Sequence, residues 1–168
     1  PATTEFMDIG GLVEGASQGE GLGNKFLAGI REVDAIVFVL RAFDDGDVPG
    51  PVDPIENLRI VEIELTLADL DAVENRINKR RKALKGAPND PDIQAEVAGL
   101  TIALAHLEEG TPLYRTDMTD DQRFAIREHF LLTNKPVMAV VNIGEDQLDE
   151  ADEIAARVAA DLPGAEVL

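Results

Sequence analysis

Cysteine and tryptophan are absent from this chain of 168 residues, and histidine occurs only twice, as His106 and His129. A chain without cysteine has no disulfide framework, no thiolate nucleophile and no cysteine-ligated zinc. Two histidines so far apart in the sequence argue against a histidine-rich metal site. Apolar runs of the ~20 residues that span a membrane are also missing, and residues 1–5 have neither the basic region nor the apolar run of a signal peptide. We therefore expect a cytoplasmic protein that makes no contact with a membrane.

Positive charge is scarce as well, since 15 Lys and Arg stand against 33 Asp and Glu, for a formal net charge of −18. Phosphate contacts need Lys and Arg, so this balance argues against a non-specific nucleic-acid binder. Six of the 15 basic residues nevertheless fall within ten consecutive positions, and these are Arg76, Lys79, Arg80, Arg81, Lys82 and Lys85. The chain does have 45% hydrophobic residues, which is enough for a sizeable core in a chain of one domain's length.

Two continuous apolar runs, at residues 35–40 and 137–141, indicate β-strands. Runs of this kind are typical of strands that are covered on both faces of a parallel sheet. Helical patterns alternate with these strands, which predicts an α/β fold with a parallel sheet. The other expected segments are a short β-prone segment at 3–8, a glycine-dense loop at 9–23, helices at 24–32 and 149–162, and the start of a strand at 165–168.

The middle of the chain carries two heptad-like patterns. Positions 60, 63, 67, 70, 74, 77, 81 and 84 step by threes and fours, and residues 93–107 repeat this spacing. A turn with glycine and proline separates the two stretches at 86–91. The pattern predicts an antiparallel coiled-coil hairpin, an arm of roughly 45 Å if each helix has about 30 residues. Glu74 and Arg81 weaken the predicted seam towards the tip, where the basic residues gather.

The basic residues of this tip, 76–85, have two interpretations. A run of charges on a helix is commonly a solvated face that binds nothing. A basic tip on a projecting arm of an acidic protein also suits an acidic partner, such as RNA or an acidic protein surface. The six basic residues are therefore candidates for partner binding.

Polar residues follow two of the expected strands, at the edge where open parallel sheets bind ligands. Asp8 stands before two glycines, and in phosphate-handling proteins such an Asp holds Mg²⁺ while a following glycine amide donates to a terminal phosphate. The alternative is a turn that Asp8 caps. Asn142 and Glu145 place an amide and a carboxylate three residues apart, as reading the edge of a nucleotide base requires. The alternative there is a helix start with Asn142 as its N-cap.

The segment from Pro1 to Leu27, with its run GASQGEGLGN, resembles the switch II region of the YchF family, an Obg-related, translation-associated branch of the P-loop NTPases. The resemblance continues through residues 30–36, 64–70 and 132–142, so it covers nearly the whole chain. It implies that the sheet is part of a P-loop NTPase-type parallel sheet. It also implies that the hairpin is the family's helical insertion, which contacts ribosomes or other partners.

The resemblance also implies roles for single residues of the first segment. Asp8 matches the switch II aspartate linked to Mg²⁺, directly or through water, and Gly11 matches the glycine whose amide senses the γ-phosphate. Leu12 falls where many GTPases carry the glutamine that orients the attacking water. A leucine cannot hydrogen-bond a water molecule, so hydrolysis is arranged otherwise in such proteins. Gly11 and Leu12 are the candidate catalytic positions.

A second set of implied roles lies after the second strand. Asn142, Ile143 and Glu145 match the base-recognition motif, to which Gly11 adds a phosphate contact. The resemblance associates Glu in place of the Asp of GTPases with a preference for ATP over GTP. Mg²⁺ is the implied cofactor, and ATP or GTP the implied substrate.

The sequence departs from the family pattern in several places. No GxxxxGK[ST] motif occurs, and residues 44–54 lack the histidine that family members commonly carry in this loop. Switch I and the C-terminal TGS domain are also missing. We expect an internal piece of a YchF-like protein that is inactive alone, with nucleotide-domain parts at 1–54 and 113–168 and a helical insertion at 55–112. The alternative is a non-enzymatic interaction module whose arm binds ribosome, RNA or a protein.

Overall fold

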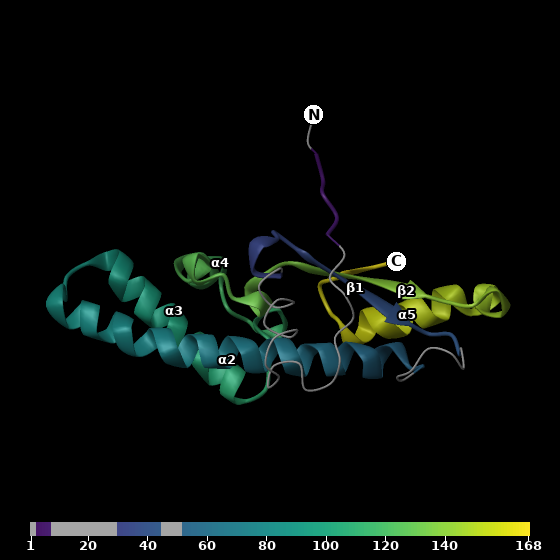
Figure 1. The fold of residues 1–168 in the computed structure, drawn as a ribbon, viewed down its shortest axis with the longest axis horizontal. Coiled ribbons are helices and arrows are strands. Elements are labelled where there is room, and N and C mark those ends of the chain that lie inside the picture. The colour runs from purple at the N-terminus through teal and green to yellow at the C-terminus, as the bar shows by residue number, and fades with distance from the viewer. Residues whose placement is uncertain (1–2, 8–29, 45–51) are drawn as a thin grey trace.

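The computed structural model describes residues 3–7, 30–44 and 52–168, and Figure 1 shows how their elements are arranged. The strands are β1 (Ile36–Arg41), β2 (Val137–Asn142) and β3 (Glu166–Val167). The α-helices are α2 (Pro54–Gly86), α3 (Pro91–Glu108), α4 (Asp120–Ala125) and α5 (Ala151–Asp161). Short 3-10 turns complete the order as η2 (Leu113–Arg115), η3 (Arg127–His129), η4 (Leu132–Asn134) and η5 (Glu145–Glu150). No helix in these ranges combines the length and the apolarity that crossing a membrane requires.

The strands form a parallel sheet in the order β1-β2-β3. The register pairs Ile36 with Val137 at one end and Arg41 with Asn142 at the other. The last residue joins the sheet as well, since Leu168 N donates to Ala139 O at 2.9 Å. The predicted α/β fold with a parallel sheet is therefore confirmed.

One face of β1 is less covered than its sequence predicts. Phe38 and Leu40 lie in the main core together with residues of α2 and α5. Val37 and Val39 alternate with them and point to the opposite face, where Val39 is 70% exposed. The expectation of cover on both faces is wrong for this strand, because an apolar run alone does not show which of its faces a helix covers. Residues 3–7 form no strand either, and Phe6 is exposed.

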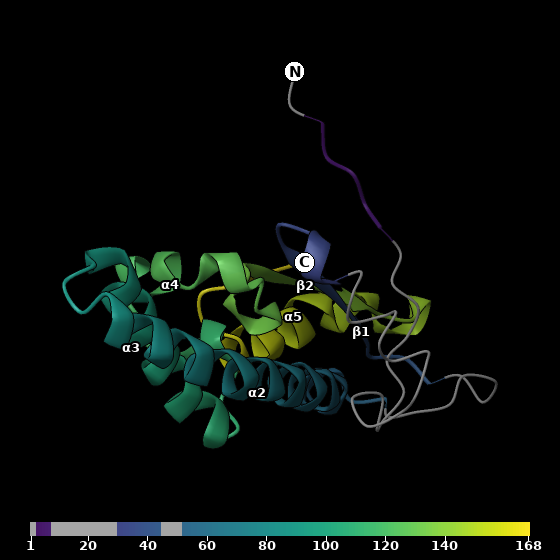
Figure 2. The same ribbon diagram turned by 60° about the vertical axis from the view of Figure 1, so that its left-hand side comes forward.

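An aspartate caps the start of each of the two long helices of the middle region. Asp53 accepts a hydrogen bond from Ile55 N at 2.9 Å ahead of α2, and Asp90 accepts one from Asp92 N at 3.0 Å ahead of α3. Proline occupies the first helical turn in both cases, where its missing N–H costs nothing. Figures 1 and 2 both show α3 running back alongside α2. The chain therefore has two long packed helices joined by a short turn, as expected.

The predicted seam of α2 is wrong over its first half. Ile63 and Leu67 are 57% and 41% exposed, although the heptad pattern places them in the seam. The buried residues that follow one stripe of the helix instead include Leu58, Glu62, Leu65, Asp69, Val73 and Ile77. Its first half faces the sheet rather than a partner helix, so the spacing follows an ordinary helix with 3.6 residues per turn.

This division also shortens the arm. Leu58 and Leu65 belong to the core that includes the strands, whereas Val73 and Ile77 pack with residues of α3 such as Leu100. Only the second half of α2 pairs with α3, and α3 has 18 residues, which is about 27 Å of helix. The expected arm of roughly 45 Å is therefore too long.

A buried carboxylate joins α2 to the segment that leads into β2. Both oxygens of Asp69 accept hydrogen bonds from the backbone, from Leu132 N at 2.8 Å and from Thr133 N at 2.7 Å. The Thr133 hydroxyl donates a third at 2.8 Å. Burial raises the pKa of Asp69, and the hydrogen bonds from Thr133 and Leu132 oppose that shift. The side chain fixes where β2 starts relative to α2.

Candidate nucleotide-binding edge and basic hairpin tip

The carboxyl ends of β1 and β2 lie level with one another. Ala42 N donates to Asn142 O at 2.8 Å, directly beyond the Arg41–Asn142 pair of the register. Asn142 and Glu145 are exposed at this edge, and Ile143 between them is half-buried. No hydrogen bond joins the side chain of Asn142 or Glu145 to the described parts of the chain. The amide and the carboxylate can therefore both meet a ligand here.

A glutamine that the sequence reading did not single out holds this loop. Gln147 Oε1 accepts from Gly144 N at 2.9 Å, and Gln147 Nε2 donates to Ala42 O at 2.8 Å, across to the end of β1. Gly144 precedes the η5 turn, and Asn142 still belongs to β2. The alternative in which Asn142 caps a helix is therefore wrong. The signal that could have found Gln147 is its place three residues after Gly144, which is the spacing of a capping box.

The loop after β1 packs against the same turn. A side chain at Gly144 would bring its Cβ within 3.5 Å of Phe43 Cβ and within 2.5 Å of an Asp146 carboxylate oxygen. The Arg41 guanidinium carbon lies 5.9 Å from the centre of the Phe43 ring. Arg41, opposite Asn142 in the register, thus adds a cation to this edge, and Phe43 adds an aromatic ring next to Gly144; neither was predicted as a site residue.

The switch II candidates Asp8, Gly11 and Leu12 lie outside the described residues. Within the described ranges, no three acidic or histidine side chains gather closely enough to hold a metal ion. The expectation of Mg²⁺ rests on Asp8 and stays a prediction.

The structure separates the six basic residues of the hairpin into two groups. Arg76 donates to His129 O, and Arg80 pairs with Glu96, whose other oxygen lies 2.7 Å from His129 Nε2. Burial lowers the pKa of Arg76. These contacts tie α2, α3 and η3 together, so Arg76 and Arg80 act inside the protein.

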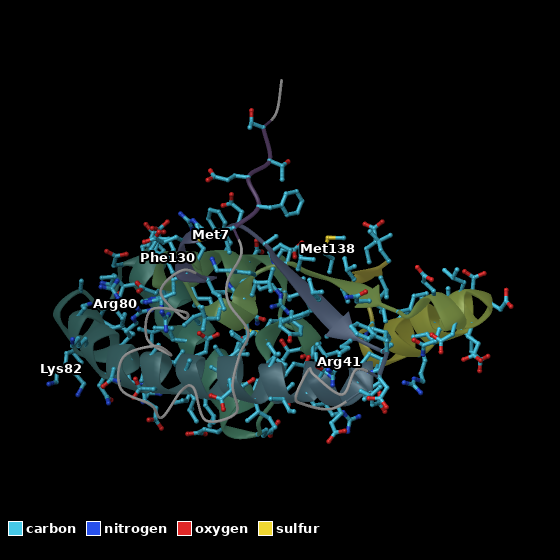
Figure 3. The ribbon with its side chains drawn as sticks, turned by 45° about the vertical axis from the view of Figure 1, so that its right-hand side comes forward. Met7, Arg41, Arg80, Lys82, Phe130 and Met138 are labelled. Carbon is cyan, nitrogen blue, oxygen red and sulfur yellow. The ribbon has the colours of Figure 1, made fainter. Side chains whose placement is uncertain are left out.

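The other four basic residues are exposed, and none makes an ion pair within the described residues. They are Lys79, Arg81, Lys82 and Lys85. Figure 3 shows Lys82 at the outer end of the hairpin, with Arg80 further in and Arg41 distant from both. The tip and the sheet edge are therefore separate candidate sites, and these four of the six basic residues stay candidates for partner binding.

The chain has an open three-stranded parallel sheet with a polar loop at its carboxyl edge. Proteins of this α/β class bind their ligands beyond the carboxyl ends of the strands. The chain is 43% identical to the "Ribosome-binding ATPase YchF" of Escherichia coli O157:H7 over 166 residues, 94% of this chain and 45% of that protein. The protein of the same name from Bacillus subtilis is 42% identical over 151 residues, 88% of this chain and 41% of that protein.

A solved structure agrees with these relatives. The Schizosaccharomyces pombe YchF GTPase superposes with a TM-score of 0.70 and 34% identity, over 95% of this chain and 46% of that one. No family model matches the chain. The chain belongs to the YchF family as a partial homologue, which confirms the resemblance, and it spans about half the length of the curated relatives it matches.

Proposed function

We propose that this chain is the part of a YchF-like NTPase that recognises the nucleotide base and contacts a partner. The single observation that carries the proposal is the exposed pair Asn142 and Glu145 at the carboxyl edge of the parallel sheet, held by Gln147. The names of the relatives, "Ribosome-binding ATPase" and "GTPase", support a nucleotide as the ligand. ATP is the preferred substrate in this proposal, and GTP is the alternative.

The chemistry of the pair fits a base edge. The Asn142 amide offers both donors and acceptors, and the Glu145 carboxylate accepts from the amino and imino groups of a base. Hydrolysis of a terminal phosphate depends mainly on positioning and on electrostatic stabilisation of the transition state. In this proposal Asp8 would hold the Mg²⁺, and Gly11 and Leu12 would act on the terminal phosphate. The sequence has no GxxxxGK[ST] loop, so the chain alone binds nucleotide weakly and does not turn it over.

The proposal includes the finer division of the fold. The nucleotide-domain parts are 1–54 and 113–168 in a P-loop NTPase-type arrangement, and 55–112 is a helical insertion that ends in a coiled-coil hairpin. The packing of the second half of α2 with α3 supports a projecting arm. Its basic tip contacts the ribosome, RNA or a protein partner. A pure interaction module is the second candidate function, favoured by the four exposed cations of the tip, which form no ion pair with the part of the chain that the structure describes.

A titration with ATP followed by NMR tests the base site. We expect the backbone amides of residues 142–147 to shift at millimolar ATP, which is an affinity of about −4 kcal/mol. The double variant N142A/E145A loses those shifts, and the control Asp146→Ala keeps them. The proposal fails if ATP moves no signal of this loop, or if N142A/E145A responds like the unchanged chain.

A further inference from the structure

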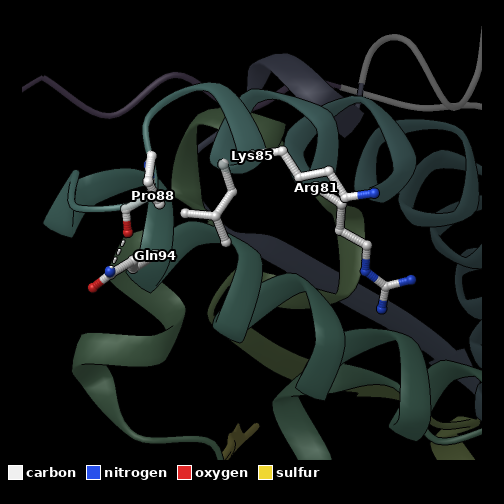
Figure 4. A pocket seen from close by; sticks show the side chains of 5 residues that line it. Arg81, Lys85, Pro88 and Gln94 are labelled. Atoms are coloured by element: carbon white, nitrogen blue, oxygen red, sulfur yellow. Dashed lines mark hydrogen bonds between the residues drawn. The ribbon is translucent and has the colours of Figure 1, made fainter.

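The geometry points to a docking groove for an acidic peptide with one apolar anchor residue at the tip of the hairpin. This inference deepens the proposed function, because it assigns a chemistry to the partner that the tip contacts. The groove is a shallow hollow of about 450 Å³, open to solvent and lined by Arg81, Leu84, Lys85, Pro88 and Gln94 (Figure 4). It therefore lies between the last turns of α2, the connecting turn and the first turns of α3.

The side of the groove formed by the connecting turn and the start of α3 is held by hydrogen bonds. Gln94 Nε2 donates to Pro88 O at 2.6 Å, which joins the start of α3 to the turn. Asp90 accepts hydrogen bonds from Asp92 N and Ile93 N at 3.0 and 3.2 Å and so fixes the first turn of α3. A surface that is already ordered costs less entropy when it binds than a loop that must order first.

The charge of the groove selects an acidic occupant. Residues 79–94 contain five cations and the two anions Asp90 and Asp92, so their net charge is 5 − 2 = +3 in a chain of −18. Arg80 is occupied by Glu96, which leaves Arg81 and Lys85 as the cations at the groove itself. An acidic segment is attracted to this end and repelled by the rest of the molecule.

The walls of the groove favour a peptide over a nucleic acid. Leu84 and Pro88 supply aliphatic surface that an apolar side chain can cover. Proteins that bind single-stranded nucleic acid stack the bases on aromatic rings, and residues 76–96 contain no aromatic residue. A leucine or phenylalanine flanked by Asp and Glu meets both features of the groove, the apolar walls and the two cations.

Fluorescence anisotropy with the full chain tests the inference. The probe is a fluorescein-labelled peptide of twelve residues, all Asp and Glu except one central Leu, and the comparison peptide has Ser in place of that Leu. We expect saturable binding of the Leu peptide at low salt and at least about tenfold weaker binding of the Ser peptide, because burying a leucine is worth roughly that factor.

Two charge-reversed variants separate the groove from the general field of the tip. R81E/K85E changes the two cations of the groove, and K79E/K82E makes the same change of charge outside it. We expect R81E/K85E to lower the affinity for the Leu peptide at least about tenfold. K79E/K82E should lower the same affinity less than about threefold. Leu84→Ser removes the difference between the Leu and Ser peptides. Circular dichroism of each variant confirms that it is folded.

Three results overturn the inference. The first is equal affinity for the Leu and Ser peptides, the second is equal loss in the two double variants, and the third is tighter binding of a twelve-nucleotide polyuridine RNA than of the Leu peptide. Co-sedimentation with ribosomes tests the proposed function separately. If the peptide results hold while ribosomes retain R81E/K85E as well as the unchanged chain, the groove stands and the ribosome is not its partner.

Discussion

The two halves of α2 have the same backbone structure and opposite surroundings. The half that faces the sheet buries polar groups, with Glu62, Thr66 and Asp69 each at 8% exposure or less. Buried polar groups require partners, and Glu62 and Asp69 have them: Arg115 Nε lies 2.6 Å from Glu62, and Asp69 receives backbone donors. The half that pairs with α3 buries apolar residues such as Val73 and Ile77, and four of its six basic residues are exposed. The comparison indicates that the first half positions the sheet, while the second half presents a surface.

The largest effect is expected where the first half of α2 meets the chain before β2. Asp69→Ala removes three hydrogen bonds and leaves Leu132 N and Thr133 N buried without acceptors, so we expect a loss of about 3 kcal/mol in the free energy of unfolding. Urea denaturation measures it. Asp71→Ala, two residues away and exposed, is the matched control and should change stability by less than about 0.5 kcal/mol. If Asp69→Ala and Asp71→Ala lower the free energy of unfolding equally, Asp69 does not have the structural role that its hydrogen bonds indicate.

The second prediction concerns alkaline pH. Burial and the neighbouring Glu62 raise the pKa of Tyr114, whose hydroxyl donates to Glu62 at 2.8 Å. The folded pKa lies above the unfolded value of about 10, so this contribution to stability is complete below pH 10 and is lost as the pH rises. We expect the free energy of unfolding to fall by about 1.4 kcal/mol per pH unit above 10 from this group.

Ultraviolet absorbance at alkaline pH measures this titration directly, because Tyr114 is the one tyrosine of the chain. The tyrosinate signal should appear together with the loss of helical circular dichroism. In Glu62→Gln the signal should appear at lower pH, because Glu62 contributes to the raised pKa. A signal that appears near pH 10 in the folded chain would contradict the raised pKa of the half-buried Tyr114.

A smaller effect is expected within the hairpin. Glu96→Ala removes the partner of Arg80 and His129, which are partly buried, and we expect a loss of about 1 to 2 kcal/mol. Thermal unfolding measures it, with exposed Glu74→Ala as the control. A loss no larger than that of the control would show that Arg80 is as available to a partner as Lys82.

The smallest effect on stability is expected at the groove. Arg81→Ala should change the free energy of unfolding by less than about 0.5 kcal/mol, because Arg81 is exposed and makes no ion pair with the described residues. The same thermal measurement serves as the test. If the free energy of unfolding falls by more than about 1 kcal/mol, Arg81 stabilises the fold as Arg80 does, and the prediction is wrong.

Local patterns in the sequence predicted most of the elements but only part of their packing. The apolar runs located β1 and β2, and the turn at 86–91 located the break between the two long helices. The heptad pattern placed Ile63 and Leu67 in a helical seam, and both are exposed. A helical period shows that one face is buried, but two faces of α2 have apolar residues and the sheet decides between them.

The candidate sites divide in the same way. The sequence located Asn142 and Glu145 after a strand, and the parallel register brings that strand's end level with Arg41. Nothing in the local pattern indicated that Gln147 would reach Ala42, because the two residues are 105 positions apart in the chain. A long-range hydrogen bond depends on how strands are aligned, and alignment is a property of the folded chain.

By itself, then, the sequence determined the family, the α/β class, the helical hairpin and the place of the basic residues along the chain. Only the tertiary structure decided which face of α2 is buried, that Arg76 and Arg80 are held by His129 and Glu96, and that Arg81 and Lys85 border a groove. The physical reason is that residue types and spacing follow from the chain alone. Whether a charge stays free depends on which distant groups the fold brings within hydrogen-bonding distance.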